Sequence, residues 1–190
     1  GSVGSGEWVG GRAAGRAGGG GWVGGQGARG EVGWGSVGAD GVARGGVLTT
    51  VLAAVDDRIV ASVVVMGCGD LPALLCRSVE PEARRLAQAH GVPKNPGPRD
   101  LEAFENLARP ILQTDPQVLA KHVDPRSIFL VTTRRDKSVP TFLQNRLYDA
   151  LGAPEAISLP TGHYSAVTYL PVIMESGRKF LARRFAAVGP

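Results

Sequence analysis

Residues 127–140 read SIFLVTTRRDKSVP, and this stretch decides the fold class. Its first seven residues, Ser127 to Thr133, are mostly apolar and β-branched, as is typical of a strand covered on both faces. A charged loop then leads to Pro140, which begins the amphipathic helix PTFLQNRLYDAL, and Gly152 ends that helix. A buried strand followed by a loop and a helix is the repeating unit of a parallel sheet.

The same unit recurs on both sides of this stretch. The residues IVASVVVM at Ile59–Met66 predict another buried strand, and EAISL at Glu155–Leu159 predicts a short third one. A small apolar helix is predicted at Gly45–Val55, and most of Tyr164–Phe185 is predicted to be helical. Strands that alternate with helices indicate an α/β fold in which helices flank both faces of a parallel sheet.

A helical and irregular insert is predicted between the first two of these strands. Residues 71–125 contain eight prolines, and we interpret the seven from Pro72 to Pro116 as breaks between short helices. The helix candidates are Glu82–His90, Asp100–Ala108 and Pro116–His122.

The composition of the chain changes abruptly near residue 44. Residues 1–44 hold 18 of the 28 glycines and all three tryptophans, and they contain no Leu, Ile, Phe, Tyr, Met, Lys or Pro. Glycine loses the most backbone entropy on folding and has no side chain to bury. The sequence therefore predicts a mostly disordered low-complexity segment at 1–44 and a folded region at 45–190.

Two origins of the segment 1–44 are open. Its residue set is that of a GC-rich gene read in the wrong frame, so one hypothesis is that the true frame resumes near Gly45; retranslating the upstream DNA tests it. The other is a natural Gly/Arg-rich tail that binds RNA. The segment has only four arginines against three acidic residues, and attraction to phosphate needs more net charge. A nucleic-acid partner is therefore disfavoured.

Composition also argues against several other classes. The net charge is only +4, and the basic residues are scattered. The longest apolar run, Ile59–Gly67, is far shorter than the roughly 20 residues that span a membrane. No signal peptide is recognisable, so we expect a cytoplasmic location. Cys68 and Cys76 lack the spacing of a metal site, so we expect plain thiols and neither a metal nor a cofactor.

Polar residues follow the strand tips where parallel sheets carry their functional groups. Asp136 follows the strand at Ser127–Thr133, and His163 follows the strand at Glu155–Leu159, 27 residues later. A carboxylate at this position can accept a hydrogen bond from an imidazole Nδ1–H, which fixes the tautomer and stabilises the imidazolium during acyl transfer. The spacing therefore predicts a His–Asp pair.

The chain resembles the α/β-hydrolase family, notably its dienelactone-hydrolase and acetyl-xylan-esterase-like branches. The matching pieces are Arg135-Asp136-x-x-Val139-Pro140, Leu159-Pro160-Thr161-Gly162-His163-Tyr164 and Val55-Asp56-Asp57-Arg58-Ile59. The resemblance covers Gly45 to Phe185 and implies the C-terminal half of that fold. It also implies a serine hydrolase of small ester or acyl substrates, with Asp136 and His163 in a Ser-His-Asp triad and the insert 71–125 as a lid.

The serine that the resemblance requires is absent. The family's Gly-x-Ser-x-Gly corresponds to Gly41-Val42-Ala43-Arg44-Gly45, with Ala43 in place of the nucleophile and the backbone N–H of Arg44 as one oxyanion donor. A methyl group cannot attack a carbonyl, so we expect the chain to be inactive. Ser36 is the nearest substitute, but it lies seven residues too early. Without the family's preceding strands, an unpaired sheet edge and exposed apolar helix faces would favour aggregation.

Simpler interpretations stay open for each of these residues. Asp136 could cap the helix near Pro140, and His163 could be a surface turn residue. His90 and His122 lie in the insert and are interpreted as structural, and Asp70 follows a strand tip and is a second candidate acid. The alternative to a damaged hydrolase is a non-catalytic binding protein with a hydrolase-like fold. The substrate and the oligomeric state are open.

Overall fold

The computed structural model describes residues 21–25 and 36–188, and these residues form a five-stranded sheet flanked by helices. The strands lie side by side in sequence order; β2 to β5 are parallel, and β1 runs antiparallel to β2. The predicted α/β class with a parallel sheet is confirmed. The strands are β1 (Gly21–Gly25), β2 (Val37–Val42), β3 (Ile59–Val65), β4 (Ile128–Thr133) and β5 (Glu155–Leu159).

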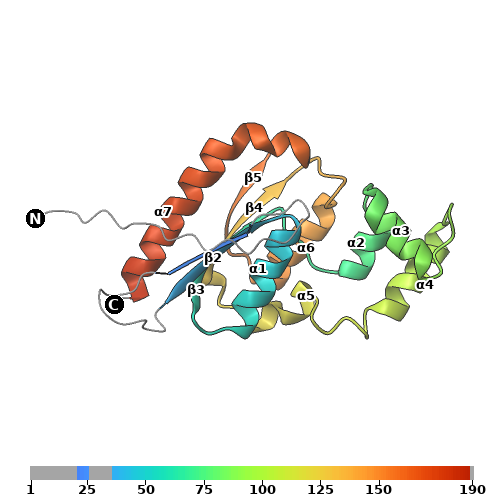
Figure 1. Ribbon diagram of the computed structural model, residues 1–190, viewed down its shortest axis with the longest axis horizontal. Helices are drawn as coiled ribbons and strands as arrows, with labels where there is room; N and C mark the ends of the chain where they lie inside the picture. The colour runs from blue at the N-terminus through green and yellow to red at the C-terminus, as the bar shows by residue number, and fades with distance from the viewer. Residues whose placement is uncertain (1–20, 26–35, 189–190) are drawn as a thin grey trace, which may run out of the picture.

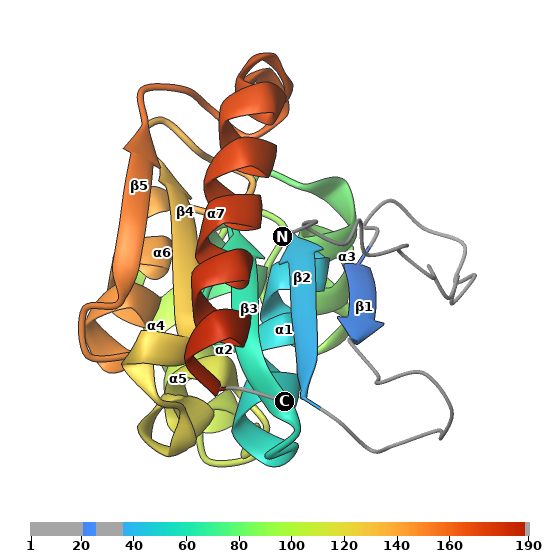
Figure 2. The same cartoon turned by 90° about the vertical axis from the view of Figure 1, so that its left-hand side faces the viewer.

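Helices cover both faces of the sheet (Figures 1 and 2). Helix α7 crosses one face and packs against β3 and β4, whereas α1 and α6 pack on the opposite face against β2, β3 and β4. Helices α2, α3 and α4 form a lobe that projects beyond the sheet (Figure 1). The helices are α1 (Arg44–Val55), α2 (Leu71–Arg77), α3 (Pro81–Ala89), α4 (Pro98–Ala108), α5 (Pro116–Leu119), α6 (Thr141–Ala150) and α7 (Leu170–Val188).

Strands β3 and β4 form the centre of the core because both of their faces are buried. Val63 and Phe129 pack toward α7, where Phe129 stacks on Phe180 with ring centroids 5.6 Å apart. Val64 and Leu130 point to the other face and belong to a second apolar cluster, which includes residues of α6. This two-sided burial explains why both strands are continuous apolar runs rather than alternating ones.

The predicted insert is helical, and its prolines begin helices rather than only ending them. Pro72, Pro81, Pro98 and Pro116 each lie in the first turn of α2, α3, α4 or α5. Proline is tolerated there because the N–H groups of the first turn have no partner within the helix. Helix α2 lies outside the three helix candidates of the sequence, and the other three helices overlap them.

Strands β1 and β2 lie within residues 1–44, the segment that the sequence predicts to be mostly disordered. Strand pairing uses backbone groups, which glycine also carries, and β2 pairs along its length with β3. The lack of a side chain is itself used at Gly38, where a Cβ would lie 3.1 Å from the ring of Phe185 in α7. The expected unpaired edge at β2 is likewise covered, because Gly21–Gly25 pairs with it. Residues 1–20 and 26–35 lie outside the described residues.

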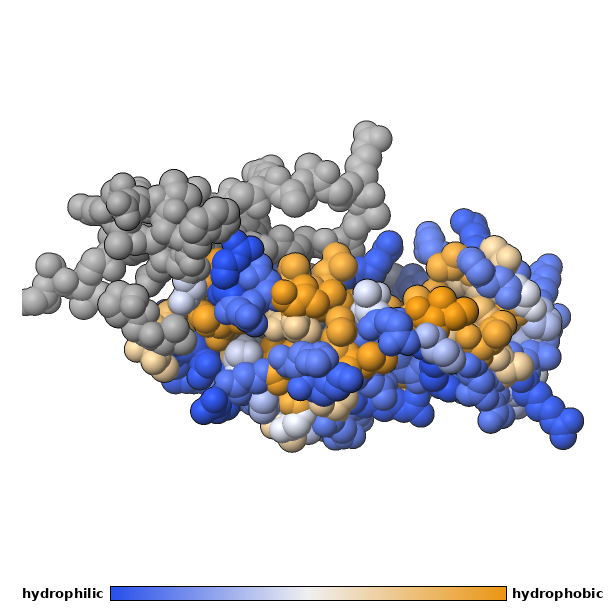
Figure 3. Space-filling model, turned by 90° about the horizontal axis from the view of Figure 1, so that it is seen from below, coloured by the Kyte–Doolittle hydropathy of each residue, from blue (hydrophilic) through white to orange (hydrophobic). Residues whose placement is uncertain are grey.

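An apolar stripe is exposed on α1. Leu48, Leu52 and Val55 are spaced four and three apart on one helix face, and they are 63%, 39% and 64% exposed. Figure 3 shows apolar side chains on one face of the molecule, over both the sheet body and the helical lobe. Within the part of the chain that the structure describes, no helix has the length and hydropathy needed to cross a membrane.

Candidate active site

Three turns meet at the carboxyl edge of the sheet, and backbone hydrogen bonds tie them to the neighbouring strands. The N–H of Ala43, just after β2, donates to the carbonyl of Val65 in β3 at 2.8 Å. The N–H of Arg135, after β4, donates to the carbonyl of Thr161, after β5, at 3.0 Å. The turns that carry the candidate residues are therefore held at one edge by the parallel register itself.

The carboxylate of Asp136 is buried in a set of hydrogen-bond donors. Its Oδ1 accepts the backbone N–H groups of Ser138 and Val139, both at 2.9 Å. Its Oδ2 accepts the Thr133 hydroxyl at 3.1 Å and the side-chain amide of Gln144 at 3.2 Å. Four donors from the β4 tip, the following loop and α6 fix the orientation of this carboxylate.

The side chains of Asp136 and His163 are in hydrogen-bond contact, with Oδ2 and Nδ1 2.8 Å apart. The Asp136 side chain is fully buried, whereas that of His163 is 17% exposed. An imidazole whose Nδ1–H donates to a carboxylate has Nε2 as its remaining basic nitrogen. The geometry therefore allows His163 to accept a proton at Nε2 while Asp136 holds the ring.

Ala43 has an unusual backbone conformation at the turn between β2 and α1. Its φ and ψ are 52° and −111°, a region that residues with a Cβ rarely adopt and that costs about 1–3 kcal/mol. The turn is tight, because a Cβ at Gly41 would overlap the carbonyl of Gly45, and a Cβ at Gly46 would lie 3.1 Å from the Cα of Gly67. A strained strand-to-helix turn that exposes one side chain is the geometry used for nucleophiles in hydrolases.

Arg44 begins α1, so its backbone N–H has no acceptor within that helix. An N–H at a helix N-terminus, next to the turn residue, is oriented to stabilise a developing negative charge. The structure thus places the predicted donor beside Ala43, although the side chain there is a methyl group.

The other sequence candidates lie elsewhere. Ser36 precedes β2, whose six residues span about 20 Å, so it lies at the opposite end of the strand from Ala43. His90 is exposed at the end of α3, and its Nδ1 contacts the carbonyl of Leu86; His122 is exposed after α5. Burial raises the pKa of the Cys68 thiol to about 12, so it is not a ready nucleophile.

The carboxylate of Asp70, the second candidate acid, is bound by arginines. Arg109 contacts both carboxylate oxygens at 3.0 Å, and Arg146 contacts Oδ2 at 2.6 Å. The backbone N–H of Asp70 donates to the side chain of Asp115, and this side chain also caps the N-terminus of α5. These contacts join the helical lobe to α6 and leave Asp136 as the acid beside the histidine.

The sequence analysis missed a contact between the helical lobe and both loops of the site. The Tyr164 hydroxyl, next to His163, donates to Glu80 at 2.8 Å, and the Ser78 hydroxyl donates to the carbonyl of Ser138 at 2.6 Å. The Val79 N–H also donates to the carbonyl of Lys137. No local signal predicts these pairs, because their members lie 58 to 84 residues apart.

The contact between Glu80 and Tyr164 shifts the pKa of both side chains. The hydroxyls of Ser138 and Tyr164 donate to Glu80 and hold the pKa of its carboxyl below the usual value. The same contact raises the pKa of Tyr164, because a phenolate beside a carboxylate is unfavourable. Glu80 thus places a negative charge near His163. Within the described ranges, no group of three or more His, Cys, Asp or Glu side chains is arranged to hold a metal ion.

Comparisons with known proteins identify the fold. No family model and no characterised protein matches the sequence. The structure of an uncomplexed acylaminoacyl peptidase from Pyrococcus horikoshii superposes with a TM-score of 0.52 at 17% identity, over 75% of this chain and 22% of the peptidase. The α/β-hydrolase GrgF from Penicillium sp. sh18 has a TM-score of 0.48 at 21% identity, over 77% of this chain and 63% of that protein.

The described part of the chain has the α/β-hydrolase fold. It spans about a fifth of the length of the peptidase that it matches. At these identities, the likeness establishes the architecture, and the chemistry has to be argued from the residues of the site.

Proposed function

We propose that this chain derives from a serine hydrolase of small ester or acyl substrates, and that its present sequence cannot form an acyl-enzyme. The observation that carries the proposal is the hydrogen bond between His163 and Asp136 at the sheet edge where the strained Ala43 turn also lies. A buried acid, an orienting contact and a partly exposed imidazole are the parts that acyl transfer requires.

In the active ancestor, a serine at position 43 would attack the substrate carbonyl. His163 would take the serine proton at Nε2 and return it to the leaving group, while Asp136 stabilises the imidazolium. The N–H of Arg44 would donate to the oxyanion. The side chain of Ala43 has neither a proton to give nor a lone pair to attack with, so the reaction cannot pass its first step.

The helical lobe formed by residues 71–125 would act as the lid that selects the substrate. The support for this role is its attachment to both loops of the site through the residues Ser78 to Glu80. A lobe that contacts the histidine loop through one exposed tyrosine can adjust the mouth of the site without disturbing the sheet.

A non-catalytic binding protein is the second candidate, and Ala43 is the observation that favours it. Such a protein would bind an ester or acyl compound at the carboxyl edge and release it unchanged. The RNA-binding alternative depends on residues 1–44, most of which lie outside the described residues, and it stays a prediction.

The experiment that tests the proposal is the substitution Ala43→Ser, assayed with p-nitrophenyl acetate. The parent chain should show no burst of p-nitrophenol, whereas the variant should show a burst that approaches one equivalent. Adding His163→Ala to Ala43→Ser should abolish the burst, because the general base is lost.

His90→Ala in the Ala43→Ser background is the matched control and should leave the burst unchanged, since His90 is exposed on the helical lobe. A folded Ala43→Ser variant without a burst would contradict the hydrolase proposal and favour the binding protein. A burst of equal size with and without His163 would remove this residue from the mechanism.

A further inference from the structure

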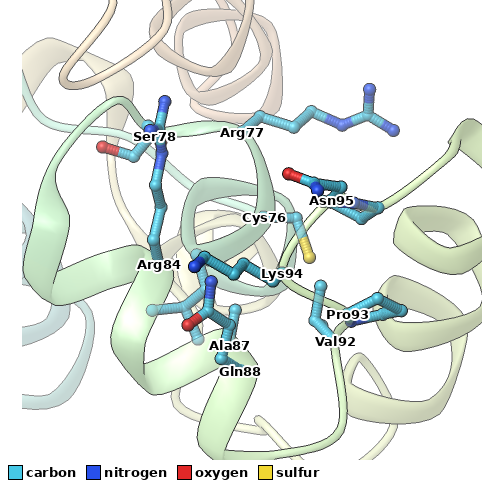
Figure 4. Close-up of a pocket in the computed structure, with 12 residues that line it drawn as sticks. Cys76, Arg77, Ser78, Arg84, Ala87, Gln88, Val92, Pro93, Lys94 and Asn95 are labelled. Atoms are coloured by element: carbon cyan, nitrogen blue, oxygen red, sulfur yellow. The ribbon is translucent and has the colours of Figure 1, made fainter.

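We propose that a hollow in the helical lobe, separate from the His163–Asp136 pair, binds the phosphate group of a small molecule. The hollow lies between α2, α3 and the segment 92–96 that leads to α4, and its volume is about 470 Å³ (Figure 4). This volume is within the range of sites that hold small organic ligands. The proposal concerns a second site and does not depend on the hydrolase chemistry.

The lining of the hollow carries three cationic side chains and no carboxylate. Arg77 comes from α2, Arg84 from α3 and Lys94 from the segment that follows α3. The side-chain amides of Gln88 and Asn95 also line the hollow and add further donors. In Figure 4, Lys94 extends toward α3, while Arg84 rises from α3 toward Ser78. Arg77 extends away from these two side chains (Figure 4) and is paired with Glu105. Arg84 and Lys94 therefore supply the positive charge of the hollow, and this charge produces a local potential that attracts anions.

Arg84 and Lys94 have no carboxylate partner within 4 Å among the described residues, whereas Arg77 has one. Arg77 is engaged through Nε, 2.7 Å from Glu105, which leaves its terminal nitrogens for another acceptor. Among the described residues, Arg84 makes only a long contact of 3.4 Å from Nε to the carbonyl of Ser78. No ion pair of Lys94 is found among the described residues, so most of the charge in the hollow is not neutralised by the lobe itself.

The thiol of Cys76 also lines the hollow, and it does not oppose an anion. Burial is the main cause that raises the pKa of the Cys76 thiol to about 11, so this side chain is neutral at physiological pH. A thiolate at this place would repel an anionic ligand, whereas a neutral thiol does not.

The number and type of the cations favour phosphate over a carboxylate. A phosphate monoester carries close to two negative charges and three acceptor oxygens at neutral pH. The guanidinium group of Arg84 can donate to two such oxygens, and Lys94 supplies a point charge. A single carboxylate would compensate only one of these two positive charges.

The test is a titration of the full chain with inorganic phosphate and, separately, with acetate at constant ionic strength, followed by ¹H–¹⁵N NMR. Phosphate should cause saturable shifts confined to amides of residues 77–96, and acetate should bind at least tenfold more weakly. Arg84→Gln and Lys94→Gln should each weaken phosphate binding by about tenfold, because each removes a charged donor.

Arg85→Gln is the matched control, since Arg85 is exposed on the same helix but does not line the hollow. It should change phosphate affinity less than twofold. Three results would overturn the proposal: no saturable shift with phosphate, equal weakening by Arg85→Gln and Arg84→Gln, or equal affinity for phosphate and acetate. Correct folding of each variant is checked in the same spectra.

Discussion

Asp70 and Asp136 follow the tips of the neighbouring strands β3 and β4, and both are about 95% buried, yet their surroundings differ. Asp136 is held by neutral donors and by one imidazole, whereas Asp70 is held by two arginines. Guanidinium groups neutralise the negative charge of a carboxylate. Neutral donors orient the carboxylate and leave its charge available for a hydrogen bond with histidine. The partners of a buried acid, rather than its burial, therefore decide which of the two aspartates can orient a histidine.

The largest expected effect is that of Asp136→Ala on stability. This change leaves the buried backbone N–H groups of Ser138 and Val139 without their acceptor, so the free energy of unfolding should fall by about 3 kcal/mol. Urea unfolding followed by circular dichroism measures the loss. Asp149→Ala, at an exposed position of α6, should stay within about 0.5 kcal/mol of the parent chain. Similar losses in the two variants would mean that the Asp136 network contributes nothing.

Asp70→Asn should lower the free energy of unfolding by a smaller amount, and this amount should depend on salt. The arginines that pair with Asp70 are 40% and 48% exposed, so the pairs are partly screened and their loss should cost about 1.5 kcal/mol. Repeating the urea unfolding in high salt should shrink this loss, whereas the loss for Asp136→Asn should change little. A loss for Asp70→Asn that is independent of salt would break the distinction between the two carboxylates.

The smallest effect is expected from breaking the contact between Glu80 in the helical lobe and Tyr164 in the histidine loop. Tyr164 has a raised pKa because its hydroxyl donates to Glu80, so the contact contributes below the usual tyrosine pKa and is lost as the pH rises through the raised value. Glu80→Gln should return the Tyr164 pKa toward its usual value of 10 in an ultraviolet titration. Glu82→Gln, on the same helix, should have a smaller effect, since Glu82 is the last of the causes that shift this tyrosine. Equal shifts in both variants would mean that the contact with Glu80 is not specific.

The predictable part of the site is the part whose signal is local. The apolar run before Asp136 and the short run before His163 predict two buried strands, and parallel strands end at one edge. The adjacency of these two side chains therefore follows from the sequence pattern. The contacts of Glu80 with Tyr164 and of Asp70 with Arg146 do not, because residues 84 and 76 positions apart meet only through the packing of the lobe.

Strand β2 lies in the segment that the sequence predicts to be mostly disordered. A glycine-rich run has no hydrophobic period, so Val37–Val42 carries no strand signal of its own. Strand β2 pairs with β3. Its glycines leave room for the ring of Phe185 and for the backbone of the turn at Ala43. Tertiary contacts here override the low strand propensity of glycine.

By itself, the sequence determined the α/β class, the order of most elements and the absence of a nucleophile at residue 43, because these depend on residue type and local periodicity. Only the tertiary structure decided which buried aspartate faces the imidazole, how β2 is held and where the cations of the lobe gather. Those features arise from contacts between residues far apart in the chain, and such contacts are set by packing geometry rather than by any local pattern.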